Sequence, residues 1–161
     1  RAVPDPMQGF DPSGHDAAAL LRLASEIPEG FEVRPLTRAD AATLGPDLSP
    51  NGMDVYESPD AFVESSAGCV AVTDDGQLAS VASSYAAALE RIGVAISTAE
   101  PWRGRGLATA VAAHLLHDCL ERGVIPEWNA ANPVSQGLAL KLGYRVGGTV
   151  TILRLGSCDP A

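Results

Sequence analysis

The segment at residues 101–109 holds two arginines and two glycines directly before a strongly helical run. Gly104 and Gly106 let the backbone turn tightly so that its N–H groups converge, and the helix that follows adds the positive end of its dipole. Arg103 and Arg105 add fixed positive charge to an otherwise acidic chain. Residues of these types at this spacing are suited to binding a pyrophosphate group.

Two widespread phosphate-binding motifs do not match this segment. A P-loop needs Gly-Lys followed by Ser or Thr, which is absent, and a dinucleotide-binding fingerprint needs a third glycine where Thr109 stands. A Gly-Arg-Gly turn before a helix is equally typical of a plain loop-to-helix connection. The neighbouring sequence therefore has to decide what the turn does.

The helix that positions this turn is expected over residues 106–122, because two apolar rows run along it. Arg122 places basic charge in its last turn, and Gly123 is able to adopt the left-handed conformation that ends a helix. One row consists of Leu107, Val111, Leu115 and Cys119, and the other of Ala112, Leu116 and Leu120.

The elements around this helix predict an α+β fold whose sheet has mixed strand directions. We expect a short helix over residues 38–44 with Thr37 as its N-cap, and a hairpin turn at Asp75-Gly76. Strands are expected at 31–36, 69–73, 77–85, 92–98 and 127–130, and a pair of strands across 144–155. A last helix is expected over residues 133–142, where Asn132 before Pro133 is a typical N-cap.

The first 30 residues are expected to lie outside the catalytic domain. Prolines and glycines in residues 1–14 predict an extended arm without ladder hydrogen bonds. Residues 15–27 predict an amphipathic helix with Ser13 and Asp16 as a capping pair and an apolar stripe of Leu20, Leu23, Ala24 and Ile27. This stripe needs the outer face of the domain, an upstream domain or a second subunit of a homodimer to cover it. The domain itself is expected over 31–155, with a tail at 156–161.

The connection at residues 45–59 is long for a compact domain and contains three prolines. A loop of this length is typical of a substrate-side loop or of a plain surface excursion. Its length alone does not separate the two.

Composition limits the partners of the chain. Its 161 residues allow one domain, and 20 acidic against 11 basic residues give a net charge of -9. This balance disfavours nucleic acid and anionic membranes as main partners, and favours cationic or amine-bearing ones. The apolar stretch at 107–116 is far shorter than the roughly 20 residues that span a bilayer.

Three cysteines, Cys69, Cys119 and Cys158, are too few and odd in number for a disulfide framework. They favour a cytoplasmic location. The chain begins at Arg1 rather than Met, so we expect residues before it, and a removed targeting segment stays open.

Two stretches in order resemble the Gcn5-related N-acetyltransferase (GNAT) superfamily. Residues 103–108, Arg-Gly-Arg-Gly-Leu-Ala, resemble its coenzyme A pyrophosphate signature of Arg or Gln followed by Gly-x-Gly/Ala. Residues 126–144 are similar to its second half. The Trp-Asn, Asn-x-x-Ser and Lys-Leu-Gly-Tyr elements there resemble a bacterial branch called the GNAT acetyltransferase family. The likeness covers about residues 31–155.

This resemblance implies a mainly antiparallel central sheet that splits between its fourth and fifth strands, with the pantetheine arm of acetyl-CoA in the split. The backbone of Ile96, Ser97 and Thr98 would bond the pantetheine, and Asn132 with Ser135 would lie near the cofactor arm. Trp128, a packing residue by its type, and Asn129 would line a substrate pocket at the mouth of the split. The pyrophosphate would contact Arg103, Gly104, Arg105, Gly106, Leu107, Ala108 and Thr109.

The chain departs from the superfamily at its general acid. Many members place a tyrosine in the last helix, where this sequence has Ala139, and Tyr144 belongs to a Gly-Tyr ending that usually packs. The coenzyme A thiolate would then leave unaided, or Ser135 or a water would donate the proton. The resemblance makes Glu90 the candidate base, and a solvated turn carboxylate is the other interpretation. Weaker candidates for this role are Glu100 and Glu127.

Other kinds of site are disfavoured. His114, His117 and Cys119 do not share one helix face at a zinc-site spacing, so we expect no metal. A nucleophilic serine would need the Gly-x-Ser-x-Gly elbow, which the chain lacks. We therefore expect an acetyl-CoA-dependent N-acetyltransferase, in which an amine of a small molecule or peptide attacks the thioester directly. The alternative is a coenzyme A binding or sensing domain without turnover.

Overall fold

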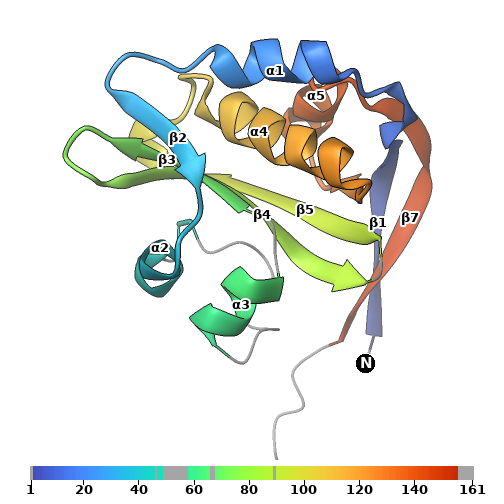
Figure 1. Cartoon of the computed structure of the whole chain (residues 1–161). Coiled ribbons are helices and arrows are strands. Elements are labelled where there is room, and N and C mark those ends of the chain that lie inside the picture. The colour runs from blue at the N-terminus through green and yellow to red at the C-terminus, as the bar shows by residue number, and fades with distance from the viewer. Residues whose placement is uncertain (1, 46, 49–57, 66–67, 89, 156–161) are drawn as a thin grey trace, which may run out of the picture.

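The computed structural model describes residues 2–45, 47–48, 58–65, 68–88 and 90–155. Within these residues, seven strands form one sheet in the order β2-β3-β4-β5-β6-β1-β7 (Figure 1). The strands are β1 (Ala2–Asp11), β2 (Phe31–Pro35), β3 (Gly68–Thr73), β4 (Leu78–Ala88), β5 (Arg91–Thr98), β6 (Ile125–Ala130) and β7 (Arg145–Leu155). All neighbours are antiparallel except β5 and β6, which confirms the predicted mixed, mainly antiparallel sheet.

The sheet opens between β5 and β6. These parallel strands pair only at their first residues, Arg91 with Ile125, Ile92 with Pro126 and Gly93 with Glu127. Beyond Gly93 and Glu127, the described residues of the two strands diverge without pairing. This is the split expected between the fourth and fifth predicted strands.

Helices cover both faces of the sheet, unequally (Figure 1). On one face lie α1 (Ala17–Ser25), α4 (Leu107–Arg122) and α5 (Pro133–Lys141), whereas α2 (Arg38–Thr43) and α3 (Pro59–Ser65) lie near β3 and β4 on the other. The α4 face holds most of the core, since Leu107, Val111 and Leu115 are buried against the strands. Around Phe62, a smaller apolar cluster joins α2 and α3 to the sheet.

The ends of α4 form as the sequence predicts. Gly106 is its N-cap with a φ of 87°, and Gly123 ends it with a φ of 68°. Both glycines adopt the left-handed conformation that residues with a side chain rarely enter. The turn over residues 104–106, referred to below as the glycine turn, thus leads directly into α4.

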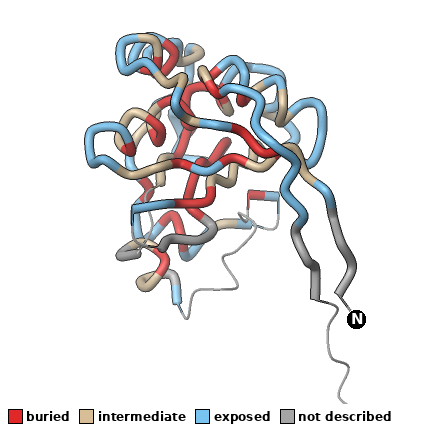
Figure 2. Tube along the Cα trace, turned by 90° about the vertical axis from the view of Figure 1, so that its right-hand side faces the viewer, coloured by how far each residue is buried: buried red, intermediate tan, exposed pale blue. Residues whose placement is uncertain are grey.

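The prediction of an N-terminal arm without ladder bonds is wrong. Residues 2–11 form β1, which pairs with β7 from Ala2 to Asp11 and with β6 only from Gln8 to Phe10. At Pro4 and Pro6, β1 therefore has one described neighbouring strand, so a proline that lacks an N–H is tolerated as on a sheet edge. The N-terminal segment and the segment beside it extend away from the rest of the tube (Figure 2).

The predicted pair of strands across 144–155 is also wrong. One strand, β7, covers this region, and its antiparallel partner is β1. Gly147 and Gly148 do not form a hairpin turn, and instead lie where the pairing register shifts between Gln8 and Phe10. The Gln8 side-chain amide donates to the Gly147 carbonyl at 2.9 Å and fixes this irregularity.

Helix α1 covers the outside of α4. The cap differs from the predicted pair, because Asp16 alone accepts from the Ala19 N–H, while Ser13 bonds Asp11. The buried stripe of Leu20, Leu23 and Ala24 packs with Ala112, Ala113 and Leu116 of α4. Three alternatives were predicted to cover this stripe, and in the structure it is covered by the outer face of the domain, at α4.

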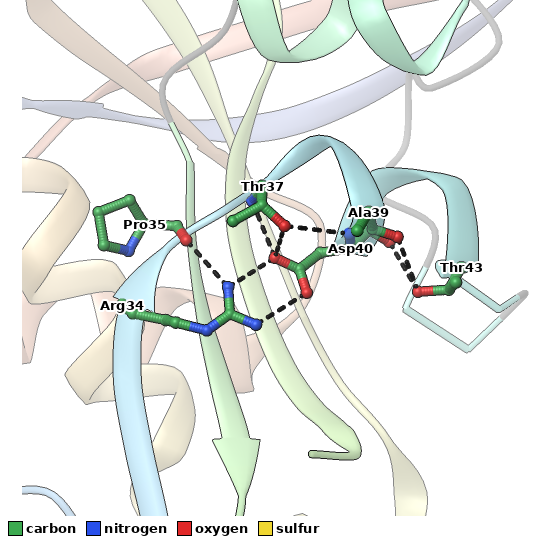
Figure 3. Close-up of polar contacts among 6 residues, drawn as sticks. All are labelled: Arg34, Pro35, Thr37, Ala39, Asp40 and Thr43. Atoms are coloured by element: carbon green, nitrogen blue, oxygen red, sulfur yellow. Dashed lines mark hydrogen bonds and ion pairs between the residues drawn. The ribbon is translucent and has the colours of Figure 1, made fainter.

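The start of α2 carries a charged network (Figure 3). Thr37 is the N-cap, as predicted, and forms a reciprocal capping box with Asp40. The Arg34 guanidinium donates to both carboxylate oxygens of Asp40, at 2.6 and 2.9 Å. The hydrogen bond from Arg34 is the largest of the causes that lower the pKa of Asp40 to about 2. The network ties β2 to α2.

Candidate functional site

A cavity of 620 Å³ lies at the open end of the split. Its walls come from the end of β5, the glycine turn, the start of α4, β6 and the start of α5. Most of the residues predicted to bind the cofactor line it, namely Ile96, Ser97, Thr98, Arg103, Gly104, Gly106, Leu107, Ala108, Asn132 and Ser135. Trp128 and Asn129, predicted for a substrate pocket, line it too, whereas Arg105 and Thr109 do not.

The β5 wall presents backbone groups. Strand β4 pairs with one edge of β5, but the edge that faces β6 has no described strand partner beyond Gly93. Backbone N–H and C=O groups need partners, so this edge is suited to bonding an extended ligand chain. On the paired side, Ser80 bonds the Ser97 carbonyl at 3.1 Å and the Thr98 hydroxyl at 2.8 Å.

The glycine turn forms the anion-binding part of the wall. Gly104 and Gly106 have φ angles of 74° and 87°, and a Cβ on either would meet nothing within 4 Å. The first amides of α4 have no acceptor within the helix and lie at its positive end. Arg103 is exposed, and its Nε donates to the Thr98 carbonyl at 3.0 Å. Backbone N–H groups of the glycine turn and the Arg103 side chain therefore border the same open part of the cavity.

Trp102 is a lining residue that the sequence analysis missed. Its ring lies edge-on to Phe31, with 5.5 Å between centroids, and the Arg105 guanidinium lies 5.2 Å from its centroid. Arg105 therefore lies against the Trp102 ring and does not itself line the cavity. The signal for this was an aromatic residue directly before two alternating arginines.

The opposite wall joins β6 to α5. The Trp128 indole Nε1 donates to the Ser135 hydroxyl at 3.1 Å. Asn132 accepts from the Ser135 N–H at 2.9 Å, which confirms its predicted role as N-cap. Asn129 is half-buried and projects toward β1, since its Oδ1 lies 3.7 Å from where a Cβ on Gly9 would be.

The three glutamates that the sequence analysis gave as candidate bases lie outside the wall of the cavity. Glu90 is exposed and precedes β5, and its carbonyl accepts from the Ile125 N–H at 2.7 Å. Neither Glu90, Glu100 nor Glu127 is a lining residue of the 620 Å³ cavity. Glu127 lies at the last pair before the split and bonds Arg91 at 2.6 Å.

Asp47 is a carboxylate of the cavity wall that sequence analysis did not single out. It belongs to the connection at 45–59, for which a substrate-side role was one interpretation. The remainder of that connection from 49 to 57 lies outside the described residues. A single aspartate among prolines gave no sequence signal.

Tyr144 packs, as expected, and does not reach the cavity. Its hydroxyl donates to the Pro126 carbonyl at 3.0 Å, and burial raises its pKa far above the ordinary value. Ala139 is fully buried in the same cluster. Neither position offers an acid to the cavity, which leaves Ser135 as the hydroxyl of the α5 wall.

On α4, His114 and His117 are half-buried and Cys119 is buried in the core. Among the residues that the structure describes, no group of three His, Cys, Asp or Glu side chains is placed to hold a metal ion. Burial raises the pKa of Cys69 to about 11 and that of Cys119 to about 12, so both thiols are protonated at neutral pH. No described helix has the length and apolar character needed to cross a membrane.

Comparison with known proteins places these features in a family. The sequence profile described as GNAT acetyltransferase matches residues 5–153. A GCN5-related N-acetyltransferase-like protein from Streptococcus suis 89/1591 is similar in structure, with a TM-score of 0.84 and 32% identity over 94% of this chain and 61% of that one. A GCN5-related N-acetyltransferase from Kribbella flavida shares the fold, with a TM-score of 0.64 and 17% identity over 95% and 58% of the two chains.

A curated relative gives a shorter match. An uncharacterized N-acetyltransferase of Bacillus subtilis (strain 168), YdfB, is 40% identical over 63 residues, which are 38% of this chain and 24% of the relative. The chain thus spans less than two thirds of the length of these relatives.

Proposed function

We propose, because the chain belongs to the GNAT acetyltransferase family, that it transfers an acetyl or other short acyl group from coenzyme A to an amine. Family membership supports acyl transfer in general. The observation that carries the proposal for this chain is that the split and the glycine turn open into the same 620 Å³ cavity. A long ligand with an anionic centre and an extended arm fits this combination.

Different residues of the cavity would bind different parts of acetyl-CoA. The amides of residues 104–108 and the Arg103 guanidinium would hold the pyrophosphate, where a Cβ at Gly104 or Gly106 would project into open space. On the free edge of β5 the backbone of Ile96 and Thr98 would bond the pantetheine arm, whereas the Ser97 carbonyl lies on the edge that is paired with β4. The bound molecule supplies the acyl group as a thioester.

Ser135 is the residue that we assign to the proton needed by the departing sulfur. Its oxygen accepts from the Trp128 indole, so its own hydroxyl proton is left to point elsewhere. The hydroxyl lines the cavity beside Asn132. This arrangement supports Ser135 as the donor in place of the tyrosine that Ala139 replaces.

The acceptor is an amine of a small molecule or peptide, and it must lose a proton before it attacks. The assignment of Glu90 as the base for this step stays a prediction. The alternative function, binding without turnover, depended on the missing tyrosine alone, and Ser135 supplies another hydroxyl.

The proposed function is tested by measuring free thiol release from acetyl-CoA with a panel of primary amines, beside calorimetry of acetyl-CoA binding. We expect amine-dependent thiol release and micromolar to millimolar binding. Binding without release for any amine would establish the sensing domain instead, and absence of both would refute the proposal.

A further inference from the structure

Two pairs of residues that are far apart in the chain pack closely against each other. Gly14 and His15, between η1 (Pro12–Gly14) and α1, lie against Gly143 and Tyr144, between α5 and β7. A Cβ on Gly14 would lie 2.5 Å from the Gly143 carbonyl oxygen. The His15 and Tyr144 rings meet edge to face, with 4.2 Å between centroids and an interplanar angle of 82°. We refer to this junction as the His15–Tyr144 contact.

The His15 ring lies in a position that suits only its neutral form. Its side chain is half-buried, and both ring nitrogens are buried. Neither nitrogen has a hydrogen-bond partner among the residues that the structure describes. An imidazolium would bring a charge and two N–H donors to this position without partners for them. Burial accordingly lowers the pKa of His15 below its ordinary value of 6.5.

Charged groups of both signs surround His15. They are Asp11 of β1, Asp16 before α1, Arg91 of β5, Arg145 of β7 and, as a titratable neutral group, Tyr144. Asp11 attracts a proton to the ring, but its effect on the pKa of His15 is smaller than that of burial. Arg145 lies over Gly14, with its Nε 3.2 Å from where a Cβ on Gly14 would be. Arg91 is paired with Glu127 of β6, and α4 contributes the apolar Leu120 to the cavity of 410 Å³ that His15 and Arg91 line.

Tyr144 joins the contact to the wall of the split. Its hydroxyl donates to the Pro126 carbonyl at 3.0 Å, and its ring centroid lies 5.4 Å from that of Trp128. Trp128 in turn donates to Ser135 in the cavity wall. Strand β6 depends on such support, because its described pairing with β5 ends at Glu127 and its pairing with β1 covers only residues 128–130. A change at His15 therefore reaches the cavity wall through one side chain, that of Tyr144.

We propose that the His15–Tyr144 contact is pH-sensitive: it forms with the neutral His15 ring and is lost when that ring takes up a proton from solvent, which loosens the β6 wall of the cavity. Proton uptake and loss of the contact are linked, because the ring is neutral in the contact and charged outside it. The contact is complete above the ordinary pKa of 6.5 and is lost as the pH falls below that value. Its effect on acetyl-CoA binding rests on the proposed function, whereas the contact itself does not.

The first test is an NMR titration of the ligand-free protein from about pH 8 to about pH 5. The His15 ring signals should titrate with a midpoint below 6.5, and the Trp128 indole N–H signal should move with the same midpoint. Nuclear Overhauser effects between the His15 and Tyr144 rings should be present at the upper pH and absent at the lower one. If they persisted while His15 was protonated, the contact would not be pH-sensitive.

Variants identify the group that moves the Trp128 signal. His15→Phe keeps a ring against Tyr144 but cannot take up a proton, so its Trp128 signal should stay constant over this pH range. His117→Phe is the matched control, on the part of α4 that bonds Glu121, and should titrate as the parent does. A Trp128 titration that persisted in His15→Phe would come from another group, such as His114, whose pKa burial also lowers, and would overturn the proposal.

The second test is calorimetry of acetyl-CoA binding at about pH 7.5 and about pH 5.5. The affinity of the parent should fall about threefold to tenfold more than that of His15→Phe, because affinity scales with the fraction of molecules in the binding-competent state. Titration of the ligand itself is the same for both proteins, so the comparison isolates His15. Equal losses in the two proteins would overturn the link to the cavity wall. If neither protein bound acetyl-CoA at the upper pH, the proposed function alone would fail, since the NMR titration decides the contact by itself.

Discussion

The indole Nε1 of Trp128 donates to the Ser135 hydroxyl across the gap between β6 and α5, at 3.1 Å. A buried indole N–H needs an acceptor, and Trp128 is only 5% exposed. The bond therefore orients Ser135 as well as satisfying Trp128. It connects the core beneath the split to a hydroxyl in the cavity wall.

Ser135→Ala should lower kcat by about tenfold to 10²-fold, because the departing sulfur loses its donor. Ser135→Thr, which keeps a hydroxyl, should recover most of the activity. Single-turnover thiol release with acetyl-CoA measures both variants. Equal rates for the alanine variant and the parent would show that the sulfur leaves without Ser135.

Gly106→Val should weaken acetyl-CoA binding by tenfold or more in calorimetry. The new side chain projects into the cavity beside the amides that would bind the pyrophosphate. Gly76→Val is a matched control, since Gly76 has nearly the same φ, 85° against 87°, and equally open space, but lies in the β3–β4 turn. If both variants bound equally well, the glycine turn would not be the pyrophosphate site.

Substitution of Asn132 separates its cap from its predicted contact with the cofactor. Asn132→Ala should destabilise the fold by about 1 kcal/mol through loss of the bond to the Ser135 N–H. Asn132→Asp should keep that stability, because aspartate is an equally good N-cap, but should weaken acetyl-CoA binding by adding negative charge to the cavity wall. Urea unfolding and calorimetry report the two effects. Parental affinity in the aspartate variant would leave Asn132 with capping alone.

Asp40 should make the stability depend on acidic pH. Its pKa in the folded state, about 2, is below the ordinary value of 3.8, so the ionised form favours folding. The contribution is complete above about pH 4 and is lost as the pH falls toward 2. Asp40→Asn should cost about 1–2 kcal/mol at pH 7, reduced by the partial exposure of Arg34, and should flatten the pH dependence in this window. Urea unfolding at pH 7 and pH 3 measures it.

The control for Asp40 is Asp60→Asn, which breaks the exposed ion pair with Arg38. Exposed pairs contribute little, so a change below about 0.5 kcal/mol is expected there. Equal losses in the two variants would contradict a special role for the Arg34–Asp40 network.

Deletion of residues 1–29 tests the predicted division at residue 30. It removes β1 from between β6 and β7 and uncovers the α4 surface under Leu20 and Leu23. Each buried leucine lost costs about 2–5 kcal/mol, so we expect the truncated chain to lose cooperative thermal unfolding. Deletion of residues 1–5 keeps the pairing of Gln8–Phe10 with β6 and should unfold cooperatively. Cooperative unfolding of the longer deletion would show that 31–155 is a domain by itself.

Local chemistry made part of this structure predictable. Gly106 and Gly123 at the ends of α4, Thr37 before α2 and Asn132 before α5 each act within a few residues of their own position. Glycine conformation and capping need no distant partner, so the sequence alone indicates them. The cavity wall around the glycine turn followed from the same local signals.

Long-range partners were the part that could not be predicted. The prolines of β1 argued against a strand, because local sequence does not show that β7 is the one described strand beside β1 where they lie. Gly147 and Gly148 have the composition of a turn, and only the approach of β1 explains Gly147, where a Cβ would lie 3.0 Å from the Gly9 carbonyl. Asp47 and Trp102 line the cavity through the same kind of distant juxtaposition.

The pairing of β1 with β7 also orders events during synthesis of the protein. Gln8 and the Gly147 carbonyl that it bonds are 139 residues apart in the chain. While a ribosome is still adding α5, β1 has only three residues of β6 to pair with. Contacts this distant in sequence close late and slowly. The β1–β7 ladder can therefore form only once β7 has been synthesised, later than the glycine turn and α4, whose contacts are local.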